Sequence, residues 1–177
     1  MFSFISYIVS LPARILGMGI GKGVVLAPGY PIFRVSYKNI RLGDKIIIGR
    51  NSFIQCFGKG KIIIGEETTI GKDVVISSNS FIQIGENCLL SYRVSILDHD
   101  HKLDRSINSP MKSGLTQGQK ITIGNNCFIG ANVCITKGVK LGRHCVVGAN
   151  SVVTKSFPDN SVIVGNPAKL IKKLPLK

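Results

Sequence analysis

The sequence predicts an all-β fold in which short strands stack as the coils of a parallel solenoid. Apolar residues recur at every sixth position in several runs, and Ile123, Ile129 and Ile135 begin the longest of these. A glycine often follows the apolar residue, as at Gly124, and a small or β-branched residue often lies four places after it, as at Cys127. A period of six fits neither the roughly 3.6 residues of a helical turn nor the continuous alternation of a long strand.

Each six-residue unit is predicted to point one apolar and one small side chain inward, and its glycine to supply the unusual backbone angles of a corner. Such a unit cannot bury its apolar face alone, so successive coils stack about 4.8 Å apart. The apolar positions are Ile48, Ile54, Ile64, Ile70, Ile76, Ile84, Leu90, Ile96, Ile123, Ile129, Ile135, Leu141, Val147 and Val153. Cys88, Cys127 and Cys145 take the small inward position, where we expect buried, reduced thiols.

Residues 1–33 carry no six-residue units and are predicted to form an arm or helix. Phe2, Ile5 and Val9 define one apolar face of that helix. It either packs on the first coil or a neighbouring subunit, or it acts as a weak anchor at a membrane surface. The segment is too short to span a bilayer and lacks the basic start of a secretory signal. We therefore expect a cytoplasmic protein, with peripheral association at the inner face of the membrane as the alternative.

The solenoid is predicted to occupy residues 34–166 and to be interrupted at three places. Gly58–Lys61 adds residues to one coil, and a slip of two residues separates Ile76 from Ile84. The largest interruption is an inserted loop over residues 97–120. Insertions in solenoids emerge as loops on one face, which is often the binding face.

Residues 167–177 are predicted to form a capping helix and a tail. Pro167 suits the first turn of a helix, and Leu170, Ile171 and Leu174 provide a short apolar stripe. This helix would cover the last coil.

The composition describes one basic domain. The 177 residues include 23 Lys and Arg against 9 Asp and Glu, a formal net charge of +14. This surplus suits an anionic partner. Nucleic acid is not expected, because the basic regions lack interleaved aromatic residues and no DNA-binding motif is present. No metal is expected either, because the cysteines and histidines do not have the spacing of zinc ligands.

The C-terminal third carries a family resemblance. The stretch "IGANVCITKGVKLGRHCVVGANSVVTKSFPDNSVIVGNPAKLIKK" (residues 129–173) resembles the galactoside and maltose O-acetyltransferases and the O-antigen and capsule acetyltransferases. Together with the repeats, residues 46–174 resemble the hexapeptide-repeat acyltransferases, whose fold is a left-handed β-helix. The resemblance implies a homotrimer that uses acetyl-CoA to O-acetylate a sugar hydroxyl of a surface glycan or its precursor.

Acetyl transfer to a hydroxyl needs a base, and a neutral imidazole is suited to that role near pH 7. The sequence "DHKLD" (residues 100–104) resembles the "THPLD" stretch that holds the base in the sugar O-acetyltransferases, which implies His101 as the base. Lys102 replaces the proline of that stretch. His99 is the alternative base, or positions the acceptor or the loop. The carboxylates that could fix the second ring nitrogen belong to Asp98, Asp100 and Asp104.

The resemblance also implies a donor site and two acceptor contacts. The donor site would lie in a groove between neighbouring solenoids, with small residues beside the pantetheine arm and lysines near the phosphates. The matching positions are Ala131, Ala149, Thr154, Lys155, Lys169 and Lys172. Asn79 would contact the acceptor. Phe128 stands where many relatives carry tryptophan, and either lines the acyl end or packs.

Three alternatives remain from the sequence. One is N-acetyl transfer to a sugar amine, and another is a non-catalytic solenoid that binds a partner. The third is a metalloenzyme like the γ-carbonic anhydrases, which needs three well-placed histidines. His144 is far along the chain from His99 and His101 and lies in an ordinary repeat corner, so this alternative is disfavoured.

Overall fold

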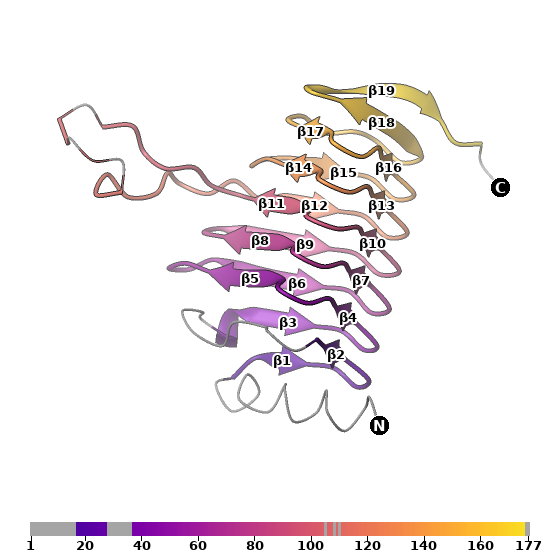
Figure 1. Ribbon diagram of the computed structural model, residues 1–177, viewed down its shortest axis with the longest axis horizontal. Helices are drawn as coiled ribbons and strands as arrows, with labels where there is room; N and C mark the ends of the chain where they lie inside the picture. Colours follow the sequence, from indigo (N-terminus) through magenta and orange to yellow (C-terminus); the bar gives the residue numbers. More distant parts are fainter. Residues whose placement is uncertain (1–16, 28–36, 105, 108, 110, 176–177) are drawn as a thin grey trace.

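The computed structural model describes residues 17–27, 37–104, 106–107, 109 and 111–175. Its short strands stack as successive coils, with the first coil and the C-terminal hairpin at opposite ends (Figure 1). The predicted all-β fold is confirmed, and the arrangement is that of a left-handed parallel β-helix. The described residues include one short 3-10 helix, η1 (Tyr37–Asn39).

The described strands form three sheets, one on each face of the coils. Sheet A contains β1 (Gly19–Ile20), β3 (Ile40–Leu42), β6 (Lys61–Ile64), β9 (Phe81–Ile84), β12 (Ile121–Ile123) and β15 (Lys140–Leu141). Sheet B contains β2 (Val25–Leu26), β4 (Ile47–Ile48), β7 (Thr69–Ile70), β10 (Leu89–Leu90), β13 (Phe128–Ile129), β16 (Val146–Val147), β18 (Ser161–Gly165) and β19 (Ala168–Lys173). Sheet C contains β5 (Phe53–Cys56), β8 (Val75–Ser78), β11 (Ser95–Leu97), β14 (Cys134–Ile135) and β17 (Val152–Val153).

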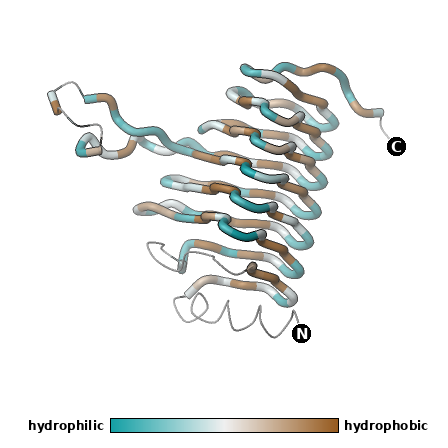
Figure 2. The backbone as a smooth tube through the Cα atoms, in the orientation of Figure 1, coloured by the Kyte–Doolittle hydropathy of each residue, from teal (hydrophilic) through white to brown (hydrophobic). Residues whose placement is uncertain are grey.

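The register between coils stacks the predicted apolar positions into columns. In sheet C, parallel pairing places the inward residues Ile54, Ile76, Ile96, Ile135 and Val153 above one another. All five are at most 1% exposed. Hydrophobic segments accordingly repeat from coil to coil in Figure 2. The six-residue period therefore describes a core in which each coil buries its apolar residues against the coils above and below.

The role expected for the repeat glycines is wrong. The corners do use left-handed backbone angles, but residues such as Asn51 (φ 58°) adopt them, and the repeat glycine Gly49 has no such angle. A Cβ at Gly49 would instead lie 2.6 Å from the main-chain carbon of Gly71 on the next coil. Glycine is required at this position because neighbouring coils approach too closely for any side chain.

The small inward positions join the coils through hydrogen bonds. The Ser52 and Thr68 hydroxyls donate to main-chain carbonyls of the next coil at 2.8 and 2.9 Å. The Cys88 thiol makes the same contact with Gly124 O at 3.2 Å. Cys88, Cys127 and Cys145 are buried free thiols, as predicted, and they also act as weak donors between coils.

The solenoid begins earlier than residue 34. β1 pairs in parallel with β3 and β2 with β4, so Gly19–Leu26 belongs to the first coil. Ile20 and Leu26 have the six-residue spacing. The repeat was not recognised here because only two units are present and the surrounding sequence is rich in glycine. The predicted helical face at Phe2, Ile5 and Val9 lies outside the described residues.

The predicted C-terminal helix is wrong, because this segment is a strand. β19 turns back and pairs antiparallel with β18, with Ala168 buried opposite Gly165. The apolar side chains expected to pack under a helix, Leu170 and Ile171, are 45% and 59% exposed. A terminal parallel strand leaves a row of main-chain donors and acceptors unpaired. A hairpin satisfies this row, whereas a helix would satisfy only its own main chain.

The inserted loop leaves the solenoid after β11 and returns at β12 (Figure 1). Its stem is an antiparallel ladder in which Lys102 N donates to Gly114 O at 2.9 Å and Thr116 N to Asp100 O at 2.8 Å. Gln119 N donates to Asp98 O at 2.8 Å, which ties the returning strand to the departure point. The loop is thus fixed at its base, where the histidines lie.

Candidate active site

The candidate site lies at the corner where the chain passes from sheet C to sheet A. Cys56 pairs with Ser78, and Ser77 pairs with Leu97, on three consecutive coils. Counting onward in the same register places Phe57, Asn79 and His99 above one another at this corner. The inserted loop departs from the third of these coils, so His99 lies at the junction of a rigid coil and its one large insertion.

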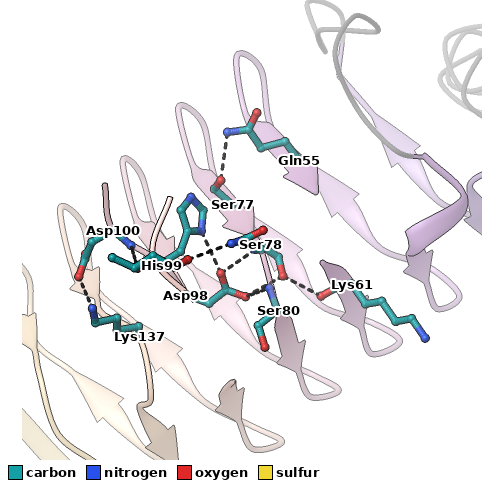
Figure 3. A network of polar contacts seen from close by, with 11 residues as sticks. Gln55, Lys61, Ser77, Ser78, Ser80, Asp98, His99, Asp100 and Lys137 are labelled. Carbon is teal, nitrogen blue, oxygen red and sulfur yellow. Dashed lines mark hydrogen bonds and ion pairs between the residues drawn. The ribbon is translucent and has the colours of Figure 1, made fainter. Parts of the chain in front are cut away.

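Asp98 is an acid in the interior of this corner. It occupies the inward position after Ile96 and is completely buried. Its carboxylate accepts hydrogen bonds from the Ser78 hydroxyl at 2.7 Å, Asn79 N at 2.7 Å and Ser80 N at 2.9 Å (Figure 3). These donors compensate the loss of water around the charge. Burial, and to a smaller extent the negative charge of Asp98, raises the pKa of the Cys56 thiol to about 12.

The ring of His99 makes a further hydrogen bond to the carboxylate of Asp98. Its Nδ1 lies 2.9 Å from Asp98 Oδ1, and its side chain is only 9% exposed. Because a carboxylate can only accept, Nδ1 carries the proton in this contact and Nε2 of the neutral ring is left as an acceptor. The ring is also held edge to face against Phe57, with centroids 5.7 Å apart and an angle of 83°. A buried acid thus orients an imidazole whose second nitrogen can act as a base.

His101 has a different environment. It lies on the exposed stem of the loop, where its main chain bridges to Leu115. Its ring makes no hydrogen bond or ion pair with any described residue. The other candidate orienting acids are also elsewhere: Asp100 pairs with Lys137 at 2.5 Å, and Asp104 accepts from the Ser106 hydroxyl and N–H. The Ser106 hydrogen bonds lower the pKa of Asp104. Of the three predicted acids, Asp98 is the one with a hydrogen bond to a histidine ring among the described residues.

Asn79 lies between Phe57 and His99 in the column. Its main-chain N–H donates to Asp98, and its side-chain amide donates to Thr116 O at 3.0 Å. The amide oxygen faces the turn after β5, since a Cβ at Gly58 would lie 3.6 Å from it. Asn79 therefore connects the returning loop strand to the corner, and its amide oxygen is directed along the same side as Phe57.

Four of the six predicted donor residues border sheet C, two on each side. Ala131 and Ala149 are neighbours on the corner between sheets B and C, where Asn150 N donates to Ala131 O at 2.8 Å. Thr154 and Lys155 follow β17 on the corner that carries His99 on an earlier coil. The last two predicted residues, Lys169 and Lys172, lie apart from these on β19.

The candidate Phe128 is not brought to this corner, and His144 lies in a repeat corner, as expected. Phe128 projects from the outer face of sheet B, in register with Leu89 and Val146, and is 40% exposed. His144 occupies a left-handed corner position with φ 55°. No group of three His, Cys, Asp or Glu side chains within the described ranges lies close enough to hold a metal ion.

Phe57, Ser78 and Ser80 were not predicted from the sequence. For two of them the sequence contained a signal. Ser78 follows an inward isoleucine by two residues, and Asp98 does the same. Phe57 lies one coil before Asn79 and two coils before His99. To use this signal, one must know how the coil that contains Gly58–Lys61 aligns with the coils after it. The added residues of that coil hide this alignment in the sequence.

Comparisons with known proteins define the class to which this fold and site belong. Residues 61–91 and 120–155 match the family described as the hexapeptide repeat of succinyl-transferase. WbbJ of Escherichia coli (strain K12), assigned as a lipopolysaccharide biosynthesis O-acetyl transferase, is 33% identical over 150 residues, which cover 81% of this chain and 76% of that protein. Some other curated relatives are longer, and this chain spans less than half of them.

Solved structures agree with this class. A maltose O-acetyltransferase from Clostridium difficile 630 superposes with a TM-score of 0.66 at 31% identity, covering 93% of this chain and 73% of that one. A hexapeptide-repeat acetyltransferase from Vibrio cholerae O1 biovar eltor, in complex with acetyl coenzyme A, gives 0.60 at 25% identity and covers 92% and 74%. The chain belongs to the hexapeptide-repeat acyltransferase superfamily and is an acyltransferase.

Within the parts of the chain that the structure describes, no helix has the length and apolar character needed to cross a membrane.

Proposed function

We propose that this protein transfers an acetyl group from acetyl-CoA to a hydroxyl of a sugar in a surface glycan or its precursor, with His99 as the general base. The pair formed by buried Asp98 and His99 at the loop junction is the observation that carries the proposal. The names of the relatives support the acyl group and the acceptor class, because WbbJ is assigned to lipopolysaccharide and the clostridial structure to maltose.

The chemistry requires one proton to move twice. Nε2 of His99 takes the proton of the acceptor hydroxyl while the hydroxyl oxygen attacks the acetyl carbonyl. The carbon–sulfur bond then breaks, and the imidazolium returns the proton to the departing sulfur, so the products are an acetyl ester and free CoA. Asp98 stabilises the imidazolium in between and keeps the ring in one tautomer. No acyl-enzyme is needed, and holding both substrates together supplies part of the acceleration.

The donor would bind along sheet C. Ala131 and Ala149 leave room for the pantetheine arm on one side, while Thr154 and Lys155 lie on the corner that carries His99. Exposed lysines such as Lys169 and Lys172 suit the CoA phosphates. We propose that the other wall of this groove comes from a neighbouring subunit in a homotrimer, in which Phe128 on sheet B would reach a partner's site. Light scattering that gives a monomer at assay concentration would refute the trimer.

Two alanine variants test the choice of base. CoA release from acetyl-CoA would be measured chromatographically with galactosides, maltose, and oligosaccharides of lipopolysaccharide and colanic acid as acceptors. His99→Ala should lower turnover by roughly 10²–10⁴ while leaving the KM for acetyl-CoA nearly unchanged. His101→Ala, which the sequence motif favours as the damaging change, should stay within a few-fold of the parent. The opposite ranking would transfer the role to His101.

A further inference from the structure

The turn that precedes Asn79 by one coil places an aromatic ring beside the proposed base. Phe57 directly precedes the added residues Gly58–Lys61, and it is 37% exposed although its ring packs edge to face with that of His99. Two main-chain hydrogen bonds of 2.8 Å hold the turn, from Phe57 N to Ser78 O and from Gly60 N to Phe57 O. The ring is therefore presented to solvent from a fixed backbone.

Polar side chains lie on the strands and turns next to this ring. Gln55 and Ser77 lie on the two coils that precede the coil of His99, and the Gln55 amide donates at 3.0 Å to the hydroxyl of Ser77, which is itself buried (Figure 3). The amide oxygen of Asn79 is directed toward the same turn. An exposed aromatic ring near the amides of Gln55 and Asn79 offers apolar contact and hydrogen bonds within one small area.

We propose that Phe57 is the residue on which the acceptor sugar stacks, so that the acceptor is a pyranose ring with an apolar C–H face. This inference rests on the proposed function, since it takes His99 as the base. Stacking one face of the ring on Phe57 directs the hydroxyls at its rim toward Nε2 of His99 and toward the amides of Gln55 and Asn79. Phe57 is then a positioning residue, and it acts on the acceptor and not on the donor.

Substitutions at Phe57 separate stacking from simple packing against His99. Phe57→Ala should raise the KM for the accepted sugar about tenfold, with the KM for acetyl-CoA unchanged and kcat reduced less than threefold. Phe57→Tyr should restore the parent KM. A fall in kcat at constant acceptor KM would mean that Phe57 only buttresses His99, and would overturn the proposal. The matched control is Ile47→Ala, an exposed apolar residue (47%) on sheet B, which should change neither KM.

A binding measurement makes the result independent of turnover. The chain contains no tryptophan, so Phe57→Trp places the only tryptophan of the chain at the site, and its emission can be excited selectively over that of the tyrosines. Titration with methyl galactopyranoside, methyl glucopyranoside and maltose should shift or quench its emission with at least one sugar, and Ile47→Trp should not respond. If acetyl transfer fails with every sugar while the Phe57→Trp signal responds, the proposed function is wrong and the sugar site stands. If no sugar changes the emission, the stacking role is refuted even where acetyl transfer occurs.

Discussion

Replacing Asp98 by asparagine tests whether this buried acid supports both the fold and the base. The substitution keeps the shape of the side chain and changes one oxygen to an NH₂ group. Oδ1 accepts from Asn79 N and His99, whereas Oδ2 accepts from the Ser78 hydroxyl and Ser80 N. Whichever position the NH₂ group takes, it faces two groups that donate in the parent protein.

The least costly arrangement places the NH₂ group at Oδ2. The Ser78 hydroxyl can turn to accept from it, because this hydroxyl still has a main-chain carbonyl to donate to at 3.1 Å. Ser80 N–H, which is partly buried, then loses its acceptor, and this costs up to about 1–3 kcal/mol. For a chain of this size that corresponds to a fall in Tm of roughly 2–12 °C. His99 keeps an acceptor, but an uncharged one that forms a weaker hydrogen bond. If the weaker hydrogen bond raises the activation free energy by about 1.4 kcal/mol, turnover should fall about tenfold.

The assay combines thermal unfolding by circular dichroism with the rate of CoA release. The control is Asp100→Asn, the same change at a 61% exposed carboxylate paired with Lys137, which should cost at most about 1 kcal/mol. In a His99→Ala background, Asp98→Asn should still lower Tm but should not reduce turnover further. An unchanged Tm, or an equal loss of turnover with and without His99, would refute this account of the corner.

Three further outcomes are expected. Gly49→Ala should lower the free energy of unfolding in urea by about 1–3 kcal/mol, because its Cβ would meet the main chain of the next coil. The control Gly114→Asn should be nearly neutral, because Gly114 has open space around it and a left-handed backbone angle that asparagine tolerates. Equal effects of the two substitutions would contradict the close approach of the coils at Gly49. The pKa of Cys56 is raised to about 12 in the folded protein, so the unfolded chain loses this proton at a lower pH. The free energy of unfolding should therefore fall as pH rises above about 9, and Cys56→Ser should make this fall less steep. Equal slopes for the parent and the variant would contradict the raised pKa of Cys56. Lys155→Ala and Lys169→Ala should each raise the KM for acetyl-CoA several-fold, less so at high salt, and an unchanged KM would remove that lysine from the donor site.

The core was predictable from the sequence because its period is local. Ile123, Ile129 and Ile135 lie at equivalent positions of successive faces, and no long-range information is needed to assign them to the interior. The start and the end of the solenoid were not predictable in this way. β1 and β2 contain only two units, and the fate of Ala168–Lys173 depends on whether an unpaired strand edge is available, which only the assembled coils determine.

The site was predictable in part. The inserted loop and its histidines follow from the break in the period, but comparison with a short motif selected His101, whereas burial and the Asp98 contact favour His99. Alternation counted from the inward Ile96 places Asp98 inside the coil, so this acid could have been recognised. The contact between Phe57 and His99 could not have been predicted, because it depends on how two coils of unequal length align in the folded solenoid.

The antiparallel return of β19 has a consequence for how copies of this protein meet. A stack of parallel coils is open-ended, and its last strand could template the first strand of another molecule into a growing fibre. β19 covers the final strand of sheet B with a reversed direction and then presents an outer edge bearing Lys169, Lys172 and Lys173. Like charges on an exposed edge oppose its pairing with an identical edge. The C-terminal hairpin therefore protects this end of sheet B against end-to-end polymerisation.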